Sequence, residues 1–304
     1  MNLLVIGGSG FVGTNVITFL TSIHSDWRIE IYSRSSSETS QKNLKLLRRK
    51  NLVTIIDTES SMNNVSKYDL ILDFGDNADL SISDSKLNSE LEKLLRNVSK
   101  HVHYIFLSST EVYGDVNEGD VVSEETEVSP KSRYAENKLR IESTITNLSQ
   151  KYFLPNITII RSCSLYGVHQ FGNKLIINCI RKTLLQEPMN IINKHTHKTY
   201  MHISEFCYIL HEIILNKVLG TYNVSGKECY SNQQILQIVR ERVGQEKDSE
   251  GHCDTTSLYF RENDGERYPV SIEKLKQKIT WYQSSNFPFA IDEIIEYVKK
   301  EMSL

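Results

Sequence analysis

The sequence predicts an α/β protein with a doubly wound parallel sheet and a smaller C-terminal α/β lobe. Two observations carry this prediction. Through the first 165 residues, apolar runs of strand length alternate with amphipathic segments of helix length, as expected of a parallel sheet covered by helices on both faces. A glycine-rich turn in the stretch VIGGSGFVG, residues 5–13, joins the first strand to the first helix.

The glycine turn has the spacing of a Rossmann dinucleotide-binding site. Of Gly7, Gly10 and Gly13, one permits the tight turn, one lets the backbone approach a pyrophosphate, and one lets the helix pack on the strand. Phe11 and Val12 then open a helix whose N-terminus faces the phosphates. Such triplets also occur in ordinary strand–helix connections. The prediction of a dinucleotide site therefore depends on further motifs in the rest of the chain.

The second strand, residues 28–33, ends in Ser33 and is followed by Arg34 and more serines. Units that prefer NAD carry an acidic residue here, which binds the ribose hydroxyls. A guanidinium and hydroxyl groups suit a 2′-phosphate better, so we favour NADP (NADPH) over NAD as the cofactor. The alternative is that Arg34 is a solvated loop residue, which leaves NAD as the cofactor.

Later elements continue the alternation. Strands are expected at residues 52–56, 68–74 and 102–107, with a basic helix ending near residue 50 and a long helix over residues 80–99. Asp57, Gly75 and the pair Ser108–Ser109 follow these three strands. Ligands bind outside the carboxyl ends of the strands in such sheets, so we expect these residues beside the glycine turn.

Residues able to transfer a proton follow the fifth strand. The stretch SSTEVYG occupies residues 108–114, and Tyr134 and Lys138 lie four residues apart in a helix expected to run from about residue 130 to about residue 150. That spacing places both side chains on one helix face. The ammonium of Lys138 stabilises a phenolate and lowers the pKa of Tyr134 from its usual value of about 10, which suits Tyr134 for general acid–base chemistry. A hydroxyl such as that of Ser109 can hold the reacting oxygen.

In this order, the glycine turn, the SSTEVYG stretch and the Tyr-x-x-x-Lys pair resemble the extended short-chain dehydrogenase/reductase family. That family includes nucleotide-sugar epimerases, dehydratases, decarboxylases and ketoreductases, and the resemblance covers nearly the whole chain. It implies that Ser109, Tyr134 and Lys138 are the catalytic trio and that Lys138 also holds the nicotinamide ribose. It further implies that Asp57 meets the adenine.

Two later stretches extend the resemblance. Residues 161–167, RSCSLYG, are similar to the family's R-x-x-N-x-Y-G segment, with Ser164 in place of the asparagine. Residues 197–205, HKTYMHISE, are similar to R-D-F-x-x-V-x-D, with Lys198 in place of an arginine that meets the sugar-nucleotide diphosphate. Arg267 resembles a second diphosphate ligand. The substrate contacts that the resemblance implies are therefore Ser109, Thr110, Ser164, Lys198 and Arg267.

The resemblance also implies a division of the chain and an assembly. The dinucleotide-binding domain would comprise residues 1–165 with about 197–224, and the substrate lobe about 166–196 and 225–304. Members of this family often form a homodimer through the helix of the catalytic tyrosine and the helix before it. The apolar side chains available for that face, which could equally pack on the sheet, are Leu139, Ile141, Ile145 and Leu148.

A fold of this kind supports several reactions. The first candidate is NADPH-dependent reduction of the 4-keto group of a nucleotide-linked (6-deoxy)sugar, with Tyr134 as proton donor and Ser109 bound to the same oxygen. Glu111 favours the alternatives, because the family's dehydratases carry T-D-E-V-Y-G, whose Asp and Glu act as acid and base, and its decarboxylases carry T-S-E. Thr110 stands in the Asp position and cannot act as a carboxylic acid. A dehydratase is therefore disfavoured, and an epimerase or decarboxylase with tightly bound NAD is the second candidate.

Composition excludes other classes. The 304 residues carry 35 basic and 38 acidic side chains, which give a formal charge of -3. This charge provides no strong positive potential that would attract nucleic acid or an anionic membrane. Five scattered cysteines and the histidines at 195, 197 and 202 lack the spacing of metal ligands. With no signal peptide or spanning segment in view, we expect a cytoplasmic enzyme without a metal. A non-catalytic dinucleotide-binding regulator is a further alternative.

Overall fold

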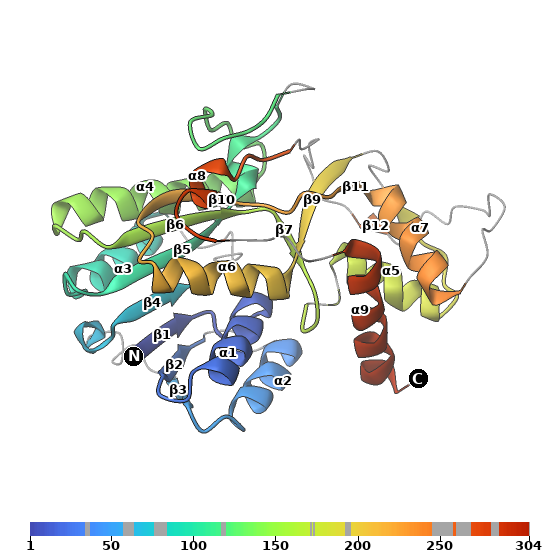
Figure 1. Ribbon diagram of the computed structural model, residues 1–304, viewed down its shortest axis with the longest axis horizontal. Coiled ribbons are helices and arrows are strands. Elements are labelled where there is room, and N and C mark those ends of the chain that lie inside the picture. Colours follow the sequence, from blue (N-terminus) through green and yellow to red (C-terminus); the bar gives the residue numbers. More distant parts are fainter. Residues whose placement is uncertain are drawn as a thin grey trace.

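A seven-stranded parallel sheet forms the centre of the computed structural model (Figure 1). Its strands are β1 (Asn2–Ile6), β2 (Arg28–Tyr32), β3 (Val53–Ile56), β4 (Leu70–Asp73), β5 (His103–Ser109), β6 (Ile157–Ser162) and β10 (Gly220–Val224). Their order across the sheet is β10-β6-β5-β4-β1-β2-β3, which is the doubly wound Rossmann arrangement. The predicted fold class is thereby confirmed.

The structure describes residues 1–33, 37–56, 64–75, 84–116, 120–170, 172, 174–191, 196–244, 258–259, 269–280 and 286–303. Three residues to which we assigned a role in binding, Arg34, Asp57 and Arg267, lie outside these ranges.

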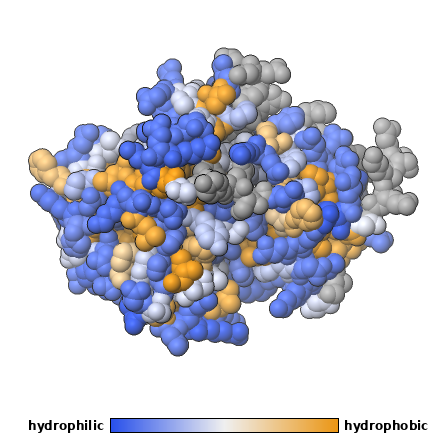
Figure 2. Space-filling view, in the orientation of Figure 1, coloured by the Kyte–Doolittle hydropathy of each residue, from blue (hydrophilic) through white to orange (hydrophobic). Residues whose placement is uncertain are grey.

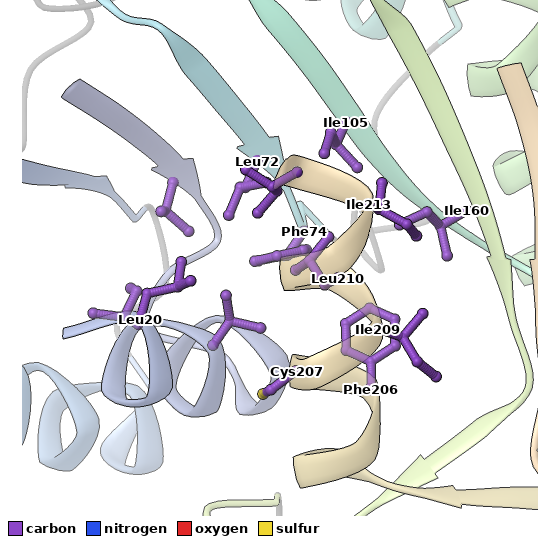
Figure 3. Close-up of a cluster of buried hydrophobic side chains, with 14 of the residues drawn as sticks. Leu20, Leu72, Phe74, Ile105, Ile160, Phe206, Cys207, Ile209, Leu210 and Ile213 are labelled. Carbon is purple, nitrogen blue, oxygen red and sulfur yellow. The ribbon is translucent and has the colours of Figure 1, made fainter. Parts of the chain in front are cut away.

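One face of the sheet is covered by α1 (Phe11–Ile23), α2 (Glu38–Leu47) and α6 (Ile203–Leu215) (Figure 1). In α6 the apolar positions recur at i, i+3, i+4 and i+7, so they form one stripe. Figure 3 shows this stripe facing the sheet, where it meets Leu72, Ile105 and Ile160. Its members are Phe206, Ile209, Leu210 and Ile213.

The opposite face is covered by α3 (Asp84–Arg96) and α4 (Arg133–Lys151). Three of the four apolar side chains considered for a dimer face, Ile141, Ile145 and Leu148, are buried in the core between α4 and the sheet. The fourth, Leu139, is half-buried and packs beside Val112. In the structure these side chains therefore pack within the chain, which is the second of the two roles considered for them, the first being a dimer interface.

A second group of elements lies beyond β6 and β10, on the right in Figure 1. This group contains a three-stranded sheet, whose strands are β7 (Ser164–Tyr166), β9 (His197–His202) and β11 (Cys229–Ser231). Helices α5, α7 and α9 share one apolar cluster, which includes the buried Phe287 at the start of α9. The bounds of the remaining elements are η2 (Val65–Lys67), η3 (Thr110–Tyr113), α5 (Leu175–Leu184), β8 (Asn190–Ile191), α7 (Asn232–Val243), β12 (Leu258–Tyr259), α8 (Glu273–Lys276) and α9 (Phe287–Met302).

One strand end differs from the sequence expectation. We placed Ser108 and Ser109 after the fifth strand, whereas β5 continues through Ser109 because these two serines pair with Arg161 and Ser162 of β6. The serines are therefore held by the ladder of the sheet rather than by a loop.

Figure 2 shows a face on which hydrophilic residues predominate and hydrophobic ones form small, separate patches. Within the described ranges, no helix combines the length and apolar character needed to cross a bilayer. The same part of the chain brings together no group of three or more His, Cys, Asp or Glu side chains suited to a metal ion.

A buried histidine joins β5 to β6 and predicts a pH dependence of stability. The Nε2 atom of His103 lies 2.7 Å from Thr158 Oγ1, and Thr158 donates to the Val218 carbonyl at 2.5 Å. Burial, and to a smaller extent the charge of Lys217, lowers the pKa of His103 from 6.5 to about 4. The unfolded chain therefore binds a proton that the folded protein does not, and stability present above the unfolded pKa is lost as the pH falls toward about 4.

We expect His103 to contribute about 3 kcal/mol to the loss of unfolding free energy between about pH 7 and about pH 4. The measurement is urea unfolding of the native protein and of His103→Gln across this range, since the difference between the two isolates this histidine from the carboxylates. Parallel pH profiles for the two proteins would contradict the prediction.

Candidate active site

A cavity of about 270 Å³ opens at the carboxyl ends of β1 and β5 and extends to β7 and β9. This is the edge of a parallel sheet at which ligands bind. Most of the candidate site residues line it, namely Gly7, Gly10, Phe11, Val12, Gly13, Ser109, Thr110, Glu111, Tyr134, Lys138, Ser164 and Lys198.

The glycine turn is built as its spacing predicts. Gly7 has a φ of +75°, and a Cβ there would lie 2.9 Å from the Phe74 carbonyl oxygen. A Cβ on Gly13 would lie 2.5 Å from the Gly8 Cα, so the absence of a side chain lets α1 approach the turn. Gly10 is the N-cap of α1 and offers no capping side chain, and the first turn carries no acidic residue. The helix therefore presents its N-terminus to the cavity as an anion site.

Gly10 provides the space that a pyrophosphate needs. Among the described residues, a Cβ on Gly10 would approach only the Gly7 carbonyl oxygen, at 3.2 Å, and Gly10 itself lines the cavity. A side chain would thus occupy the cradle at the helix N-terminus. The residues present fit a dinucleotide.

Two further residues assigned to the cofactor lie near the turn without lining this cavity. The hydroxyl groups of Ser33 and Ser9 are hydrogen bonded to each other. The Gly75 amide donates to Asp73 Oδ1 at 2.9 Å, and the hydroxyl of the buried Tyr104 donates to Asp73 Oδ2 at 2.6 Å. Their contact with a cofactor stays a prediction, as do those of Arg34, Asp57 and Arg267.

Ser109 and the two residues after it form one wall. Ser109 Oγ accepts from the Glu111 amide at 3.1 Å and so caps η3. Thr110 and Glu111 are buried in this short helix. Ser132 Oγ lies 3.4 Å from Glu111 Oε2 and accepts from the Ala135 amide at 3.1 Å, so one hydroxyl links Glu111 to the start of α4.

Tyr134 and Lys138 approach from α4, one turn apart. Lys138 is only 4% exposed, and its Nζ donates to the Leu107 carbonyl at 3.0 Å. The same Nζ lies 5.0 Å from the ring centroid of Phe106 and 5.7 Å from that of Tyr134. A buried ammonium beside the phenol is the arrangement that the Tyr-x-x-x-Lys spacing predicts, and both residues line the same cavity as Ser109.

The far end of the cavity is polar and basic. Ser164 comes from β7, Lys198 and Tyr200 from β9, Lys174 from the N-cap of α5, and Asn232 from the start of α7. The described lining contains three lysines, Lys138, Lys174 and Lys198, and one acidic residue, Glu111, and this excess of positive charge favours an anionic ligand.

Among the polar lining residues at this end that the sequence did not single out are Lys174, Tyr200 and Asn232. A signal existed for Tyr200, because residues i and i+2 of a strand share a face and Tyr200 stands two after Lys198. Lys174 and Asn232 begin helices that the sequence places far from the catalytic motifs, and nothing local distinguishes them.

The thiol of Cys163 also lines the cavity. Burial raises the pKa of Cys163 to about 11, despite hydrogen bonds that include one from the Gly226 amide. The raised pKa favours the neutral thiol, which is a poor nucleophile compared with a thiolate.

Known proteins share this sequence pattern and fold. The NAD-dependent epimerase/dehydratase family matches residues 3–225. The dTDP-glucose 4,6-dehydratase of Xanthomonas campestris pv. campestris is 26% identical over 201 residues, which make up 64% of this chain and 57% of that protein. The chain thus matches little more than half the length of this relative.

Solved structures agree in fold over the whole chain. That of dTDP-glucose 4,6-dehydratase from Bacillus anthracis in complex with NAD has a TM-score of 0.86 and 18% identity, covering 100% of this chain and 98% of its own. The structure of UDP-glucuronic acid 4-epimerase from Bacillus cereus in complex with UDP-glucuronic acid and NAD has a TM-score of 0.83 and 18% identity. The match covers 99% of this chain and 100% of the epimerase chain. The resemblance to the extended short-chain dehydrogenases/reductases is confirmed, and the chain belongs to the NAD-dependent epimerase/dehydratase family.

Proposed function

We propose that the protein is a nucleotide-sugar oxidoreductase that transfers hydride at C4 of the sugar. One observation carries this proposal: a single cavity is lined by the glycine turn, by Ser109, Tyr134 and Lys138, and by the basic end with Lys174 and Lys198. These three parts suit a dinucleotide, a reacting carbinol or carbonyl, and a diphosphate.

The turn and α4 would hold the cofactor. The backbone from Gly7 to Gly13 would bind the pyrophosphate at the N-terminus of α1, and Lys138 would bind the nicotinamide ribose. When bound, the nicotinamide supplies or accepts the hydride. Lys138 is already fixed to the β5 backbone through the Leu107 carbonyl, so its ammonium needs little reorganisation to serve this role.

Tyr134 would move the proton. Its hydroxyl gives a proton to the oxygen of a carbonyl being reduced, or takes one from a carbinol being oxidised, and the adjacent ammonium of Lys138 stabilises the phenolate form. Ser109 would hydrogen bond the same oxygen. Lys198 and Lys174 would pair with the diphosphate of the substrate, and Ser164 and Thr110 would contact the sugar nucleotide.

For the net reaction, our first candidate is NADPH-dependent reduction of a 4-keto (6-deoxy)sugar. Thr110 supports it, because the carboxylic acid that a dehydratase needs for removing water is replaced by a hydroxyl in the wall of the cavity. Ser33 and Arg34 support NADPH through their fit to a 2′-phosphate.

The second candidate is an epimerase-type or decarboxylase-type reaction that retains NAD. It is favoured by Glu111, whose carboxyl group belongs to the cavity wall, and by relatives in fold whose structures hold NAD.

The two candidates differ in what happens to the cofactor. The purified protein is incubated with NADPH or NADH and a panel of 4-keto-6-deoxy nucleotide sugars, and the absorbance of the reduced nicotinamide is followed. A reductase oxidises the cofactor with at least one sugar. No oxidation with any of them, together with NAD⁺ retained through purification, would overturn the reductase and support the second candidate.

Arg34→Asp tests the cofactor preference. We expect NADPH to lose at least about tenfold in affinity relative to NADH, because the guanidinium is replaced by a group that repels a 2′-phosphate and accepts from ribose hydroxyls. The measurement is the ratio of the two dissociation constants. An unchanged ratio would show that Arg34 lies away from the ribose.

The domain division at about residue 165, a homodimer through α3 and α4, and a cytoplasmic location also stay predictions. Residues on the adjoining surfaces of α3 and α4 pair within the chain: Thr144 donates to Asn88 at 3.1 Å, and Lys151 and Tyr152 both donate to Glu92. Light scattering at micromolar protein concentration tests whether the dimer forms.

A further inference from the structure

A buried ion pair lies behind the candidate catalytic residues and joins α4 to β6. The Nη2 atom of Arg161 lies 2.8 Å from Glu142 Oε2, and its Nε lies 3.2 Å from both carboxylate oxygens. The two residues are 9% and 5% exposed. Neither lines the cavity, so the pair is no part of the site described above.

Each partner also holds a segment that carries site residues. Ser108, which precedes Ser109, donates its hydroxyl proton to Glu142 Oε1. Arg161 Nη1 donates to the Tyr113 hydroxyl at 3.0 Å, and Tyr113 donates to Asn223 Oδ1 at 2.7 Å. Tyr113 is the last residue of η3, the helix that bears Thr110 and Glu111. One ion pair therefore connects the end of β5, η3 and α4.

The register of α4 adds to this argument. Tyr134, Lys138 and Glu142 are spaced at i, i+4 and i+8, and so share one face of the helix. Lys138 bonds to the Leu107 carbonyl and Glu142 to the Ser108 hydroxyl. The helix is thus attached to β5 at the two residues directly before Ser109.

Stability alone does not account for such a pair. Removing two charges from water costs so much that replacing a buried ion pair with apolar groups of similar volume is often neutral or stabilising. What the paired guanidinium and carboxylate do provide is a fixed geometry. Catalysis is sensitive to that geometry, because a displacement of about 1 Å can cost a hundredfold in rate.

We propose that Glu142 is a positioning residue, which through Ser108 and Arg161 fixes Tyr134 and Lys138 against Ser109. The inference rests on the proposed function, because the groups that it positions are those of the proposed active site. Glu142 acts on the reaction only through these neighbours.

The test replaces both charges, since Glu142→Leu alone would leave the Arg161 guanidinium buried without its partner. We expect the double variant Glu142→Leu/Arg161→Met to keep the native melting temperature, with kcat reduced about a hundredfold and KM and the dinucleotide dissociation constant within threefold of native values. Glu92→Gln, which breaks a pair with Lys151 at the other end of α4, is the control and keeps native kinetics. A stable double variant with kcat within threefold of native would overturn the proposal.

A second readout requires no substrate. Backbone amide exchange, measured by mass spectrometry, should become at least about tenfold faster in residues 107–113 and 133–138 of the double variant and stay unchanged in α6. Unchanged exchange in all three segments would overturn the positioning role, whereas absence of turnover in the native protein would overturn only the proposed function.

If the double variant does not fold, Ser108→Ala provides an alternative test of the same proposal. It removes one hydrogen bond and no charge. We expect kcat to fall about tenfold with KM unchanged and the same two segments to exchange faster; native kcat and native exchange would together contradict the proposal.

Discussion

We expect turnover by the Tyr134→Phe variant to fall about a thousandfold, while its dinucleotide dissociation constant stays within threefold of the native value. Phenylalanine fills the volume of the tyrosine ring beside Lys138, whose Nζ lies 5.7 Å from the ring centroid. The phosphate cradle at Gly7 to Gly13 comes from a different element and is unaffected. Only the hydroxyl proposed to transfer the proton is lost, so the effect is expected in kcat. Single-turnover kinetics and a cofactor titration measure the two quantities.

Tyr152→Phe is the matched control for this substitution. Tyr152 follows the last residue of α4, and its hydroxyl donates to Glu92 at 2.8 Å, away from the cavity. We expect it to keep native turnover. If Tyr134→Phe kept more than about a tenth of native turnover, Tyr134 would not be the proton donor, since a positioned acid or base contributes at least about a hundredfold.

Gly13→Ala has the second large effect, a loss of at least about a hundredfold in dinucleotide affinity accompanied by a lower melting temperature. Alanine favours a helix by about 1 kcal/mol over glycine, so propensity alone would predict stabilisation. Here the added Cβ would lie 2.5 Å from the Gly8 Cα and 2.6 Å from the Gly7 carbonyl oxygen. Both are backbone atoms of the turn, so α1 has to move away from it and the anion site opens.

Gly10→Ala distinguishes an effect on dinucleotide binding at the glycine turn from an effect on the stability of the fold. The added Cβ approaches the Gly7 carbonyl oxygen only to 3.2 Å and would enter the space proposed for the pyrophosphate. We expect a native melting temperature and an affinity about tenfold weaker. Calorimetric titration and thermal unfolding of both variants give the comparison, and native affinity in Gly10→Ala would show that the phosphates bind elsewhere.

Local patterns made the first half of the fold predictable. The turn at Gly7 to Gly13 could be predicted because its conformation depends on nearby glycines, and the doubly wound parallel sheet could be predicted from the alternation of strands with helices. Tyr134 and Lys138 could be predicted because their relation is fixed within one helix. Gly7, Gly10 and Gly13 line the cavity together with Tyr134 and Lys138.

The features that could not be predicted from the sequence depend on contacts between distant segments of the chain. Glu142 has the spacing of an ordinary polar helix residue, and its burial depends on Arg161 in the next strand. Lys174 and Asn232 reach the cavity only because β7, β9 and α7 bring the second group of elements against the sheet edge. No local pattern encodes such placements.

The most direct test of the proposed function follows the hydrogen at C4. The protein is given nucleotide sugars carrying deuterium at C4 together with NAD⁺ or NADP⁺, and 4-keto-6-deoxy nucleotide sugars together with deuterated NADH or NADPH, and mass spectrometry locates the label. Hydride transfer at C4 predicts deuterium on the nicotinamide in the first case or on C4 of the sugar in the second, and the transfer should be lost in Tyr134→Phe. Label that stays in place with both cofactors, in sugars that are all recovered without a change of C4 configuration or loss of carbon dioxide, would contradict the account.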